Sequence, residues 1–176
     1  MAKGLNALHQ LKVLHRDIKS ANVFLSRNGT VKLGDMNVSK VLRKNVMCET
    51  QTGTPYYASP EVWQDQPYDE KSDIWSLGCV LYEFINLKPP FRARDMEGLF
   101  KKVTRGYYSR ISKTYSEDLS LLLKSLIKVD PKDRLTTCTL YQIQSNYLRC
   151  LSSELMKNGP ATKNYSRSLF CSKLSS

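Results

Sequence analysis

The chain has no long hydrophobic run and no cysteine pattern, and these absences exclude several classes of protein. No stretch of its 176 residues approaches the length of a membrane-spanning helix, and the first residues lack the apolar core of a signal peptide. The five cysteines are scattered without C-x-x-C spacing, so neither a zinc site nor a disulfide framework is indicated. We therefore expect a single domain with reduced thiols, located in the cytoplasm or the nucleus and without membrane contact.

Acidic residues are also few. The chain has 16 of them against 27 lysine and arginine residues, which gives a net charge of +11. A nucleic-acid surface is one interpretation, and a basic protein surface followed by a basic tail is the other. No recognition helix or aromatic-basic motif accompanies the charge, so we expect no specific nucleic-acid partner.

Local patterns predict a mainly helical chain with one small β-hairpin. Helices are predicted at residues 1–10, 71–86, 97–104 and 117–128, and from about residue 137. In the first of these, Leu5, Leu8 and Leu11 recur at helical spacing. The second has apolar residues on more than one face, so we expect it to be central and buried.

The hairpin is predicted from two short apolar runs at residues 22–25 and 30–33. Between them, Asn28-Gly29 favours a tight turn, because both residues tolerate positive φ. Residues 36–60 lack periodicity and indicate a long loop, and long ordered loops are usually functional.

Three motifs follow one another along the chain. The segment His15–Asn22 reads H-R-D-I-K-S-A-N, Asp35 follows thirteen residues after Asn22, and residues 53–61 read G-T-P-Y-Y-A-S-P-E. Taken alone, Asp17 could be a loop-capping aspartate. With Lys19 and Asn22 close behind it, a catalytic base is the better interpretation of Asp17.

In this order the motifs resemble the catalytic half of a eukaryotic protein kinase. Together with Ser72–Cys79, which reads S-D-I-W-S-L-G-C, they are most similar to the NIMA-related serine/threonine kinases. The resemblance implies a mainly α fold, the C-terminal lobe of a protein kinase with a small β-hairpin at the catalytic loop. This lobe would span residues 1–148, followed by a basic, serine-rich, poorly ordered tail at 149–176.

The resemblance also implies ATP and Mg²⁺ as cofactors and assigns roles in phosphoryl transfer. Asp17 would be the catalytic base, and Lys19 would contact the transferred phosphoryl group. Asn22 and Asp35 would hold the magnesium through oxygen atoms, which suit this hard cation. Phe24 would form the apolar floor under adenine, although a core strand aromatic is an equal alternative.

Two positions indicate the substrate class. Lys19 matches serine/threonine kinases, and Thr54 in this family lies near the base and favours Ser/Thr acceptors. Protein substrates with Ser/Thr acceptors are therefore the implied partners. Thr50, three residues before Gly53, matches the spacing of the activating threonine in related kinases, and Arg16 is placed to receive its phosphate. Thr52 is the competing site, and Ser39, close to the metal ligand, is less favoured.

Three further residues are implied to be structural. Glu61 would pair with Arg134, and Asp73 would anchor the backbone of the catalytic loop. Loss of one partner from a buried ion pair costs about 3–5 kcal/mol.

The chain departs from the kinase pattern in two ways. Asp35-Met36-Asn37 stands where kinases usually read D-F-G, although the metal ligand itself is kept. No Gly-rich loop, strand lysine or helix glutamate of an upper lobe is present, and Met1 lies within the predicted first helix. We therefore expect a truncated catalytic lobe that is inactive by itself and exposes a surface for the missing lobe or a partner.

A non-catalytic, kinase-like interaction module is the alternative function. Family likeness adds centrosomal, ciliary and nuclear locations to the cytoplasmic default.

Overall fold

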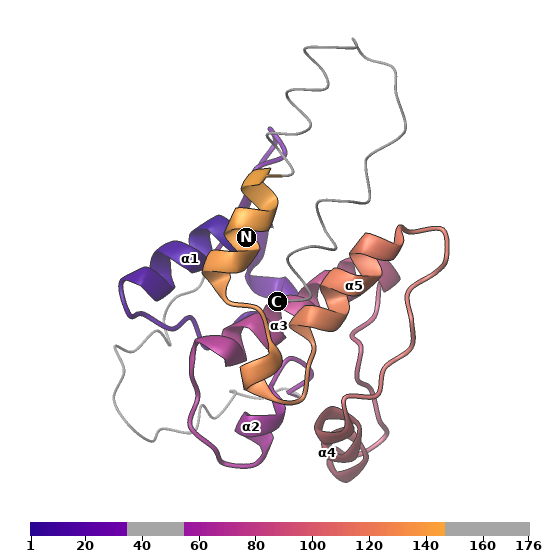
Figure 1. Cartoon of the computed structure of the whole chain (residues 1–176). Coiled ribbons are helices and arrows are strands. Elements are labelled where there is room, and N and C mark those ends of the chain that lie inside the picture. The colour runs from indigo at the N-terminus through magenta and orange to yellow at the C-terminus, as the bar shows by residue number, and fades with distance from the viewer. Residues whose placement is uncertain (35–54, 147–176) are drawn as a thin grey trace.

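The computed structural model describes residues 1–34 and 55–146, and helices dominate this part of the chain (Figure 1). The labelled helices are α1 (Ala2–Gln10), α2 (Pro60–Trp63), α3 (Glu70–Asn86), α4 (Met96–Arg105) and α5 (Glu117–Leu126). Two 3₁₀ turns, Ser20–Asn22 and Pro131–Asp133, and a last helix over 137–146 complete the helical part. All five predicted helices are confirmed. Within the predicted loop 36–60, residues 36–54 lie outside the described residues, as does the predicted tail 149–176.

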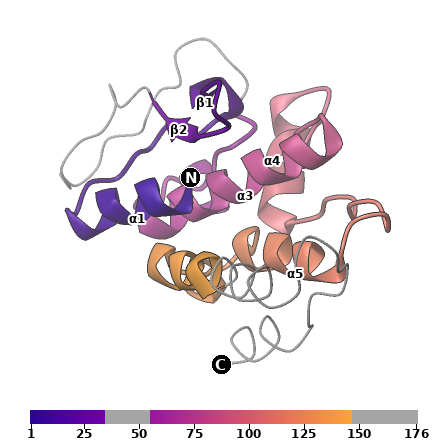
Figure 2. The same ribbon diagram turned by 90° about the horizontal axis from the view of Figure 1, so that it is seen from above.

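Helix α3 runs through the middle of the molecule, with α1 and the hairpin on one side and α5 on the other (Figure 2). Its first turn is closed by a capping box, in which the Asp69 side chain accepts from the Ser72 amide and the Ser72 hydroxyl lies near the Asp69 amide. Ile74 and Trp75 are fully buried, so the prediction of a central helix is confirmed. A Cβ atom at Gly78 would lie 2.8 Å from Cβ of Leu126, so α3 and α5 approach closely only because this residue is glycine.

The core beside α3 is aromatic. The rings of Trp75 and Phe91 stack with 5.3 Å between their centroids. Tyr108 packs edge-on against both Phe91 and Tyr82, at 5.8 and 5.5 Å. These geometries add to the burial of the large rings, and they fix the segment after α4 to α3.

Strands β1 (Val23–Leu25) and β2 (Val31–Leu33) form the predicted antiparallel hairpin, with Val23 opposite Leu33. The turn differs from the expectation, because among its residues only Gly29 has a positive φ, of 78°. Asn28 instead accepts hydrogen bonds through its side chain from the Ser26 hydroxyl and the Thr30 amide. The result is a three-residue loop that ends in a left-handed glycine.

Helix α1 does not bury the whole row of leucines at positions 5, 8 and 11. Leu5 is fully buried, but Leu11 is 74% exposed. The helix ends at Gln10, and Lys12 has a φ of 60°, so the chain turns away before Leu11 can reach the core. His9, one helical turn after Leu5, takes the buried position instead.

Helix α4 lies against α2, where the ring of Phe100 meets the ring of Trp63 edge-on at 6.1 Å. Asp95 caps its N-terminus, and Gly106 ends it in the left-handed conformation with a φ of 64°. None of the described helices combines the length and the apolar character needed to cross a membrane.

Candidate active site

The segment His15–Asn22, called the catalytic loop below, connects α1 to β1. It is tied down by Asp73, which lies on α3 and is fully buried. The two oxygens of Asp73 accept from the backbone amides of His15 and Arg16, at 2.9 and 3.0 Å. Arg16 has a φ of 67°, a conformation that costs energy for a non-glycine residue and needs such external support. The implied anchoring role of Asp73 is thus matched by its contacts.

Asp73 has two further partners that sequence reasoning missed. Nε2 of His9 lies 2.8 Å from one of its oxygens, and the Tyr68 hydroxyl donates to the other at 2.6 Å. Burial by itself raises the pKa of Asp73, but the hydrogen bonds from His9, Tyr68 and the two loop amides outweigh it and lower that pKa below its ordinary value. The carboxylate therefore stays charged inside the protein. The helical spacing of His9 from Leu5 was the one available signal.

Asp17 is held by the two residues that follow it in the motif. The Lys19 ammonium donates to Oδ2 of Asp17 at 2.8 Å, and the Asn22 amide donates to the same oxygen at 3.1 Å. The Asn22 amide also donates to the Asp17 backbone carbonyl at 2.8 Å. Among the described residues, no hydrogen-bond donor reaches Oδ1 of Asp17.

The same contacts orient Asn22. Its side-chain nitrogen is used by Asp17, and no donor among the described residues takes its side-chain oxygen. A buried amide oxygen in this position suits Mg²⁺. Asp35, the second expected ligand, and Thr50 and Thr54 lie outside the described residues. In the described part of the chain no group of three or more His, Cys, Asp or Glu side chains could form a metal site.

Phe24 is on β1, directly after the catalytic loop. Its side chain is 54% exposed, so the alternative of a core aromatic is wrong. One edge of the ring lies over Gly34, where an added Cβ would come within 2.6 Å of it. Leu25 and Val31 on the same hairpin are exposed as well. The hairpin therefore exposes apolar side chains on both of its faces, with Phe24 on one face and the paired Leu25 and Val31 on the other.

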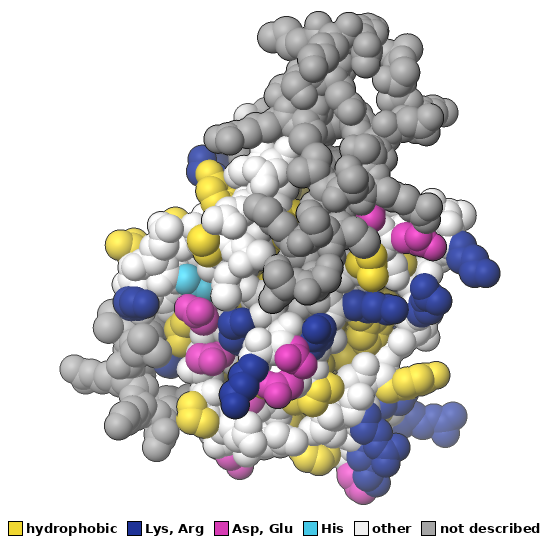
Figure 3. Space-filling view, in the orientation of Figure 1, with side chains coloured by type: hydrophobic (Ala, Val, Ile, Leu, Met, Phe, Trp, Pro, Cys, Tyr) yellow, Lys and Arg dark blue, Asp and Glu magenta, His cyan; other side chains and the backbone are white. Residues whose placement is uncertain are grey.

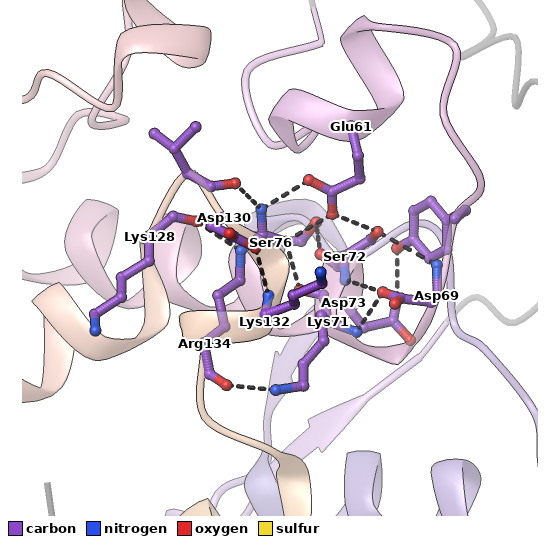
Figure 4. Close-up of polar contacts among 12 residues, drawn as sticks. Glu61, Asp69, Lys71, Ser72, Asp73, Ser76, Lys128, Asp130, Lys132 and Arg134 are labelled. Atoms are coloured by element: carbon purple, nitrogen blue, oxygen red, sulfur yellow. Dashed lines mark hydrogen bonds and ion pairs between the residues drawn. The ribbon is translucent and has the colours of Figure 1, made fainter. Parts of the chain in front are cut away.

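Glu61 and Arg134 form the expected ion pair (Figure 4). Every one of the five donor positions of the Arg134 guanidinium is used. Two bonds reach Glu61, and three reach the backbone carbonyls of Lys71, Lys128 and Val129. The guanidinium also lies over the Trp75 ring, 5.0 Å from its centroid. Arg134 thus joins α2, the start of α3 and the segment after α5.

Burial raises the pKa of Glu61, but the hydrogen bonds from Arg134 and Ser72 lower it further than burial raises it, so the net shift is downward. Ser72 donates to Glu61 at 2.6 Å and also takes part in the capping box of α3. The same serine therefore couples the ion pair to the start of the helix that carries Asp73. Sequence reasoning did not identify Ser72.

A second missed feature is a hydrogen-bonded chain from the catalytic loop to α3. The Ser20 hydroxyl lies 2.9 Å from the Tyr57 hydroxyl, which donates to Glu83 at 2.6 Å. Burial and the hydrogen bond to Glu83 raise the pKa of Tyr57 to about 12. Tyr57 stays protonated at neutral pH and so links the loop beside Lys19 to the G-T-P-Y-Y segment.

Arg16 has an unsatisfied group at this site. Its Nε atom is buried and has no hydrogen-bond partner among the described residues. A buried donor of this kind is costly, and it can be satisfied by an anion such as a phosphate.

Comparison with known proteins agrees with the resemblance. Residues 1–148 match the protein kinase domain family. The chain is 50% identical over 132 residues to the mouse serine/threonine-protein kinase Nek1, which is 74% of this chain and 11% of that protein. It is 47% identical over 133 residues to human Nek5 and 46% over 138 residues to mouse Nek3, covering 19% and 27% of those proteins.

These matches cover most of this chain but about a quarter or less of each of the three relatives. The catalytic-loop motif and its anchor on α3 lie within the matched region. The chain belongs to the protein kinase family, and its relatives there are NIMA-related serine/threonine kinases.

Proposed function

We propose that this chain forms the C-terminal catalytic lobe of a serine/threonine protein kinase, which transfers the γ-phosphate of ATP to Ser or Thr side chains of proteins. The observation that carries the proposal is the arrangement of Asp17. Its carboxylate is held through one oxygen by Lys19 and Asn22, and it lies on a loop fixed to buried Asp73. Phosphoryl transfer depends mainly on such positioning and on charge stabilisation.

In the transfer step, Oδ1 of Asp17, which no donor among the described residues reaches, would accept the proton of the substrate hydroxyl. The hydroxyl oxygen forms a bond to the γ-phosphorus, and the bond from that phosphorus to the bridging oxygen of ADP breaks. Lys19 remains close to Asp17 and can balance the negative charge on the transferred group. Tyr57, through Ser20, holds this part of the loop against α3.

The residues fit the cofactors of the family. Asn22, with Asp35, would hold Mg²⁺, whose charge offsets that of the phosphates. Phe24 would lie under the adenine ring, and its exposure leaves it free to do so. Thr54 would lie near the base and favour Ser/Thr substrates, and phosphorylated Thr50 would bind Arg16.

Residues 1–148 would be this lobe and 149–176 a separate tail. The Gly-rich loop and the strand lysine that complete an ATP site are not in this sequence. An upper lobe supplied with the chain would cover the exposed hairpin residues. Cytoplasmic, centrosomal, ciliary and nuclear locations all agree with the proposed function.

A non-catalytic interaction module is the second candidate. The observation in its favour is the apolar hairpin surface, where Leu25 is 72% exposed. Exposed apolar groups that lie together indicate a binding surface. The two candidates differ in one respect, because only the kinase needs the Asp17 carboxylate.

The test is phosphate transfer by the full-length gene product that contains this chain. We expect transfer from ATP and Mg²⁺ to a basic acceptor protein to fall by about 10²–10⁴-fold in kcat for Asp17→Asn. Asp65→Asn is the matched control. Asp65 is exposed and has a φ of 56°, which asparagine tolerates. The Asp65→Asn variant should therefore keep the kinase activity of the unmutated protein. The interaction module would be favoured if Asp17→Asn kept full kinase activity, or if the unmutated protein showed no phosphate transfer.

A further inference from the structure

The surface around α4 is strongly basic. Residues 88–113 contain eight lysine and arginine residues and two acidic ones, so this segment carries +6 of the net charge of +11. In Figure 3 the dark blue side chains gather at the lower right, where Figure 1 places α4, with yellow hydrophobic side chains beside them. All eight cations are exposed.

Both acidic residues of the segment are already engaged. Asp95 caps α4 by accepting from the Gly98 amide, and Glu97 pairs with Lys101. The other seven cations form no ion pair among the described residues. The structure therefore leaves a concentrated positive charge that its own described groups do not balance.

A cavity of about 280 Å³ lies at one end of this surface, between the segment after α4 and α5. Part of its lining is apolar, from Tyr108, Ile111, Leu123 and Ile127. The Tyr108 wall is held in place by its edge contacts with Phe91 and Tyr82. Arg110 and Lys124 also line the cavity, and both are exposed and have no ion pair in the described part of the chain.

We propose that this cavity binds an acidic polypeptide segment, which inserts one aliphatic side chain between Tyr108 and α5 and places carboxylates at Arg110 and Lys124. Charge complementarity identifies the partner as acidic. The apolar lining favours a protein over a nucleic acid, because a nucleic acid offers no aliphatic side chain to fill it. The tail of this chain is not the occupant, because residues 147–176 carry a net charge of +4.

Exposed apolar residues near the cations extend the same argument. Tyr107 is 78% exposed next to the cavity, and Met96 is 51% exposed on α4. Mixed apolar and cationic surfaces are suited to acidic segments with hydrophobic anchors. The proposal does not depend on phosphoryl transfer, since binding is measured without ATP.

The test uses the purified chain and a fluorescein-labelled peptide of Glu, Asp and Gly residues with one central Leu. Fluorescence anisotropy should show binding at an ionic strength of about 0.15 M. A peptide with Gly in place of the central Leu should bind at least ~10-fold more weakly, because it cannot fill the cavity. Arg110→Glu and Lys124→Glu should each weaken binding of the Leu peptide by ~10-fold or more. Lys3→Glu makes the same charge change at an exposed position of α1, and it should weaken binding of the Leu peptide less than ~3-fold.

Three results would overturn the proposal. The first is absence of binding by the Leu peptide. The second is that the Leu and Gly peptides bind equally, or that Arg110→Glu and Lys3→Glu weaken binding of the Leu peptide equally. Either result would mean that the peptide is held only by general charge attraction. The third is displacement of the Leu peptide by an equal concentration of a single-stranded oligonucleotide of the same charge, if Arg110→Glu weakens oligonucleotide binding as much as it weakens peptide binding. That result would indicate a polyanion surface instead.

Discussion

Glu61 and Arg134 are 73 residues apart in the chain, yet both carboxylate oxygens of Glu61 accept from Arg134, at 2.6 and 2.7 Å. Both residues are buried, with 3% and 2% of their surface exposed. A buried charge of either sign is tolerated only while its partner is present. This pair therefore fixes α2 and the segment after α5 to the start of α3, the helix that anchors the catalytic loop.

The two members of this pair should be energetically coupled. Arg134→Met leaves Glu61 as an uncompensated buried charge, and we expect a loss of about 3–5 kcal/mol in the free energy of unfolding. Urea denaturation of the chain measures this loss. The double variant Glu61→Gln/Arg134→Met should lose clearly less than the sum of the two single variants. Additive losses would mean that the two groups are not coupled.

Acid should destabilise the protein through Asp73 and Glu61. Their pKa values are lowered in the folded state, so the folded form holds the charged carboxylates more strongly than the unfolded chain does. This stability is complete above the unfolded-state pKa values, near pH 4, and is lost as the pH falls through the folded-state values. Melting temperatures measured from pH 6 to pH 3 should fall steeply. For Asp73→Asn the fall should be shallower, although this variant is less stable at pH 6. Parallel curves would contradict the assignment.

Two glycines should respond to alanine in opposite directions. At Gly78 an added Cβ would lie 2.7 Å from a side-chain carbon of Ile127 and 2.8 Å from Cβ of Leu126. Overpacking of about 1–3 kcal/mol should outweigh the roughly 1 kcal/mol gained in helix propensity. At Gly4 on α1 nothing lies within 4 Å of the added carbon, so alanine should stabilise by up to about 1 kcal/mol. The unfolding free energies of the two variants give the comparison, and stabilisation by Gly78→Ala would show that α5 moves aside at little cost.

Phosphorylation of Thr50 should activate the full-length enzyme. The phosphate would satisfy Arg16, whose buried Nε has no partner among the described residues. Thr50→Ala should lower activity by at least ~10-fold, and mass spectrometry of the active enzyme should find phosphate on Thr50. Thr52 is the competing site, and Thr52→Ala should leave more activity than Thr50→Ala if the assignment to Thr50 is right. If Thr50 carries no phosphate in the active unmutated enzyme and Thr50→Ala keeps full activity, the assignment is wrong.

Several features could be predicted from the sequence because they depend on neighbours along the chain. Helix α3 is marked by its apolar residues and begins at a capping pair three residues apart. The hairpin follows from two short runs around a glycine that takes a positive φ. The motif with Asp17, Lys19 and Asn22 also lies within six residues, so the sequence could group these three side chains at one site, although their contacts with one another were not predicted.

Other features were decided only by tertiary packing. Asp73 receives its four hydrogen bonds from α1, the catalytic loop and Tyr68, and His9 contributes only because α1 packs across α3. Leu11 fits the helical spacing but is exposed, because the chain turns at Lys12. Periodicity reports which face of an element is apolar, but it does not report which distant element covers that face. The hydrogen bonds that link Ser20, Tyr57 and Glu83 across 63 residues depend on which distant elements pack together.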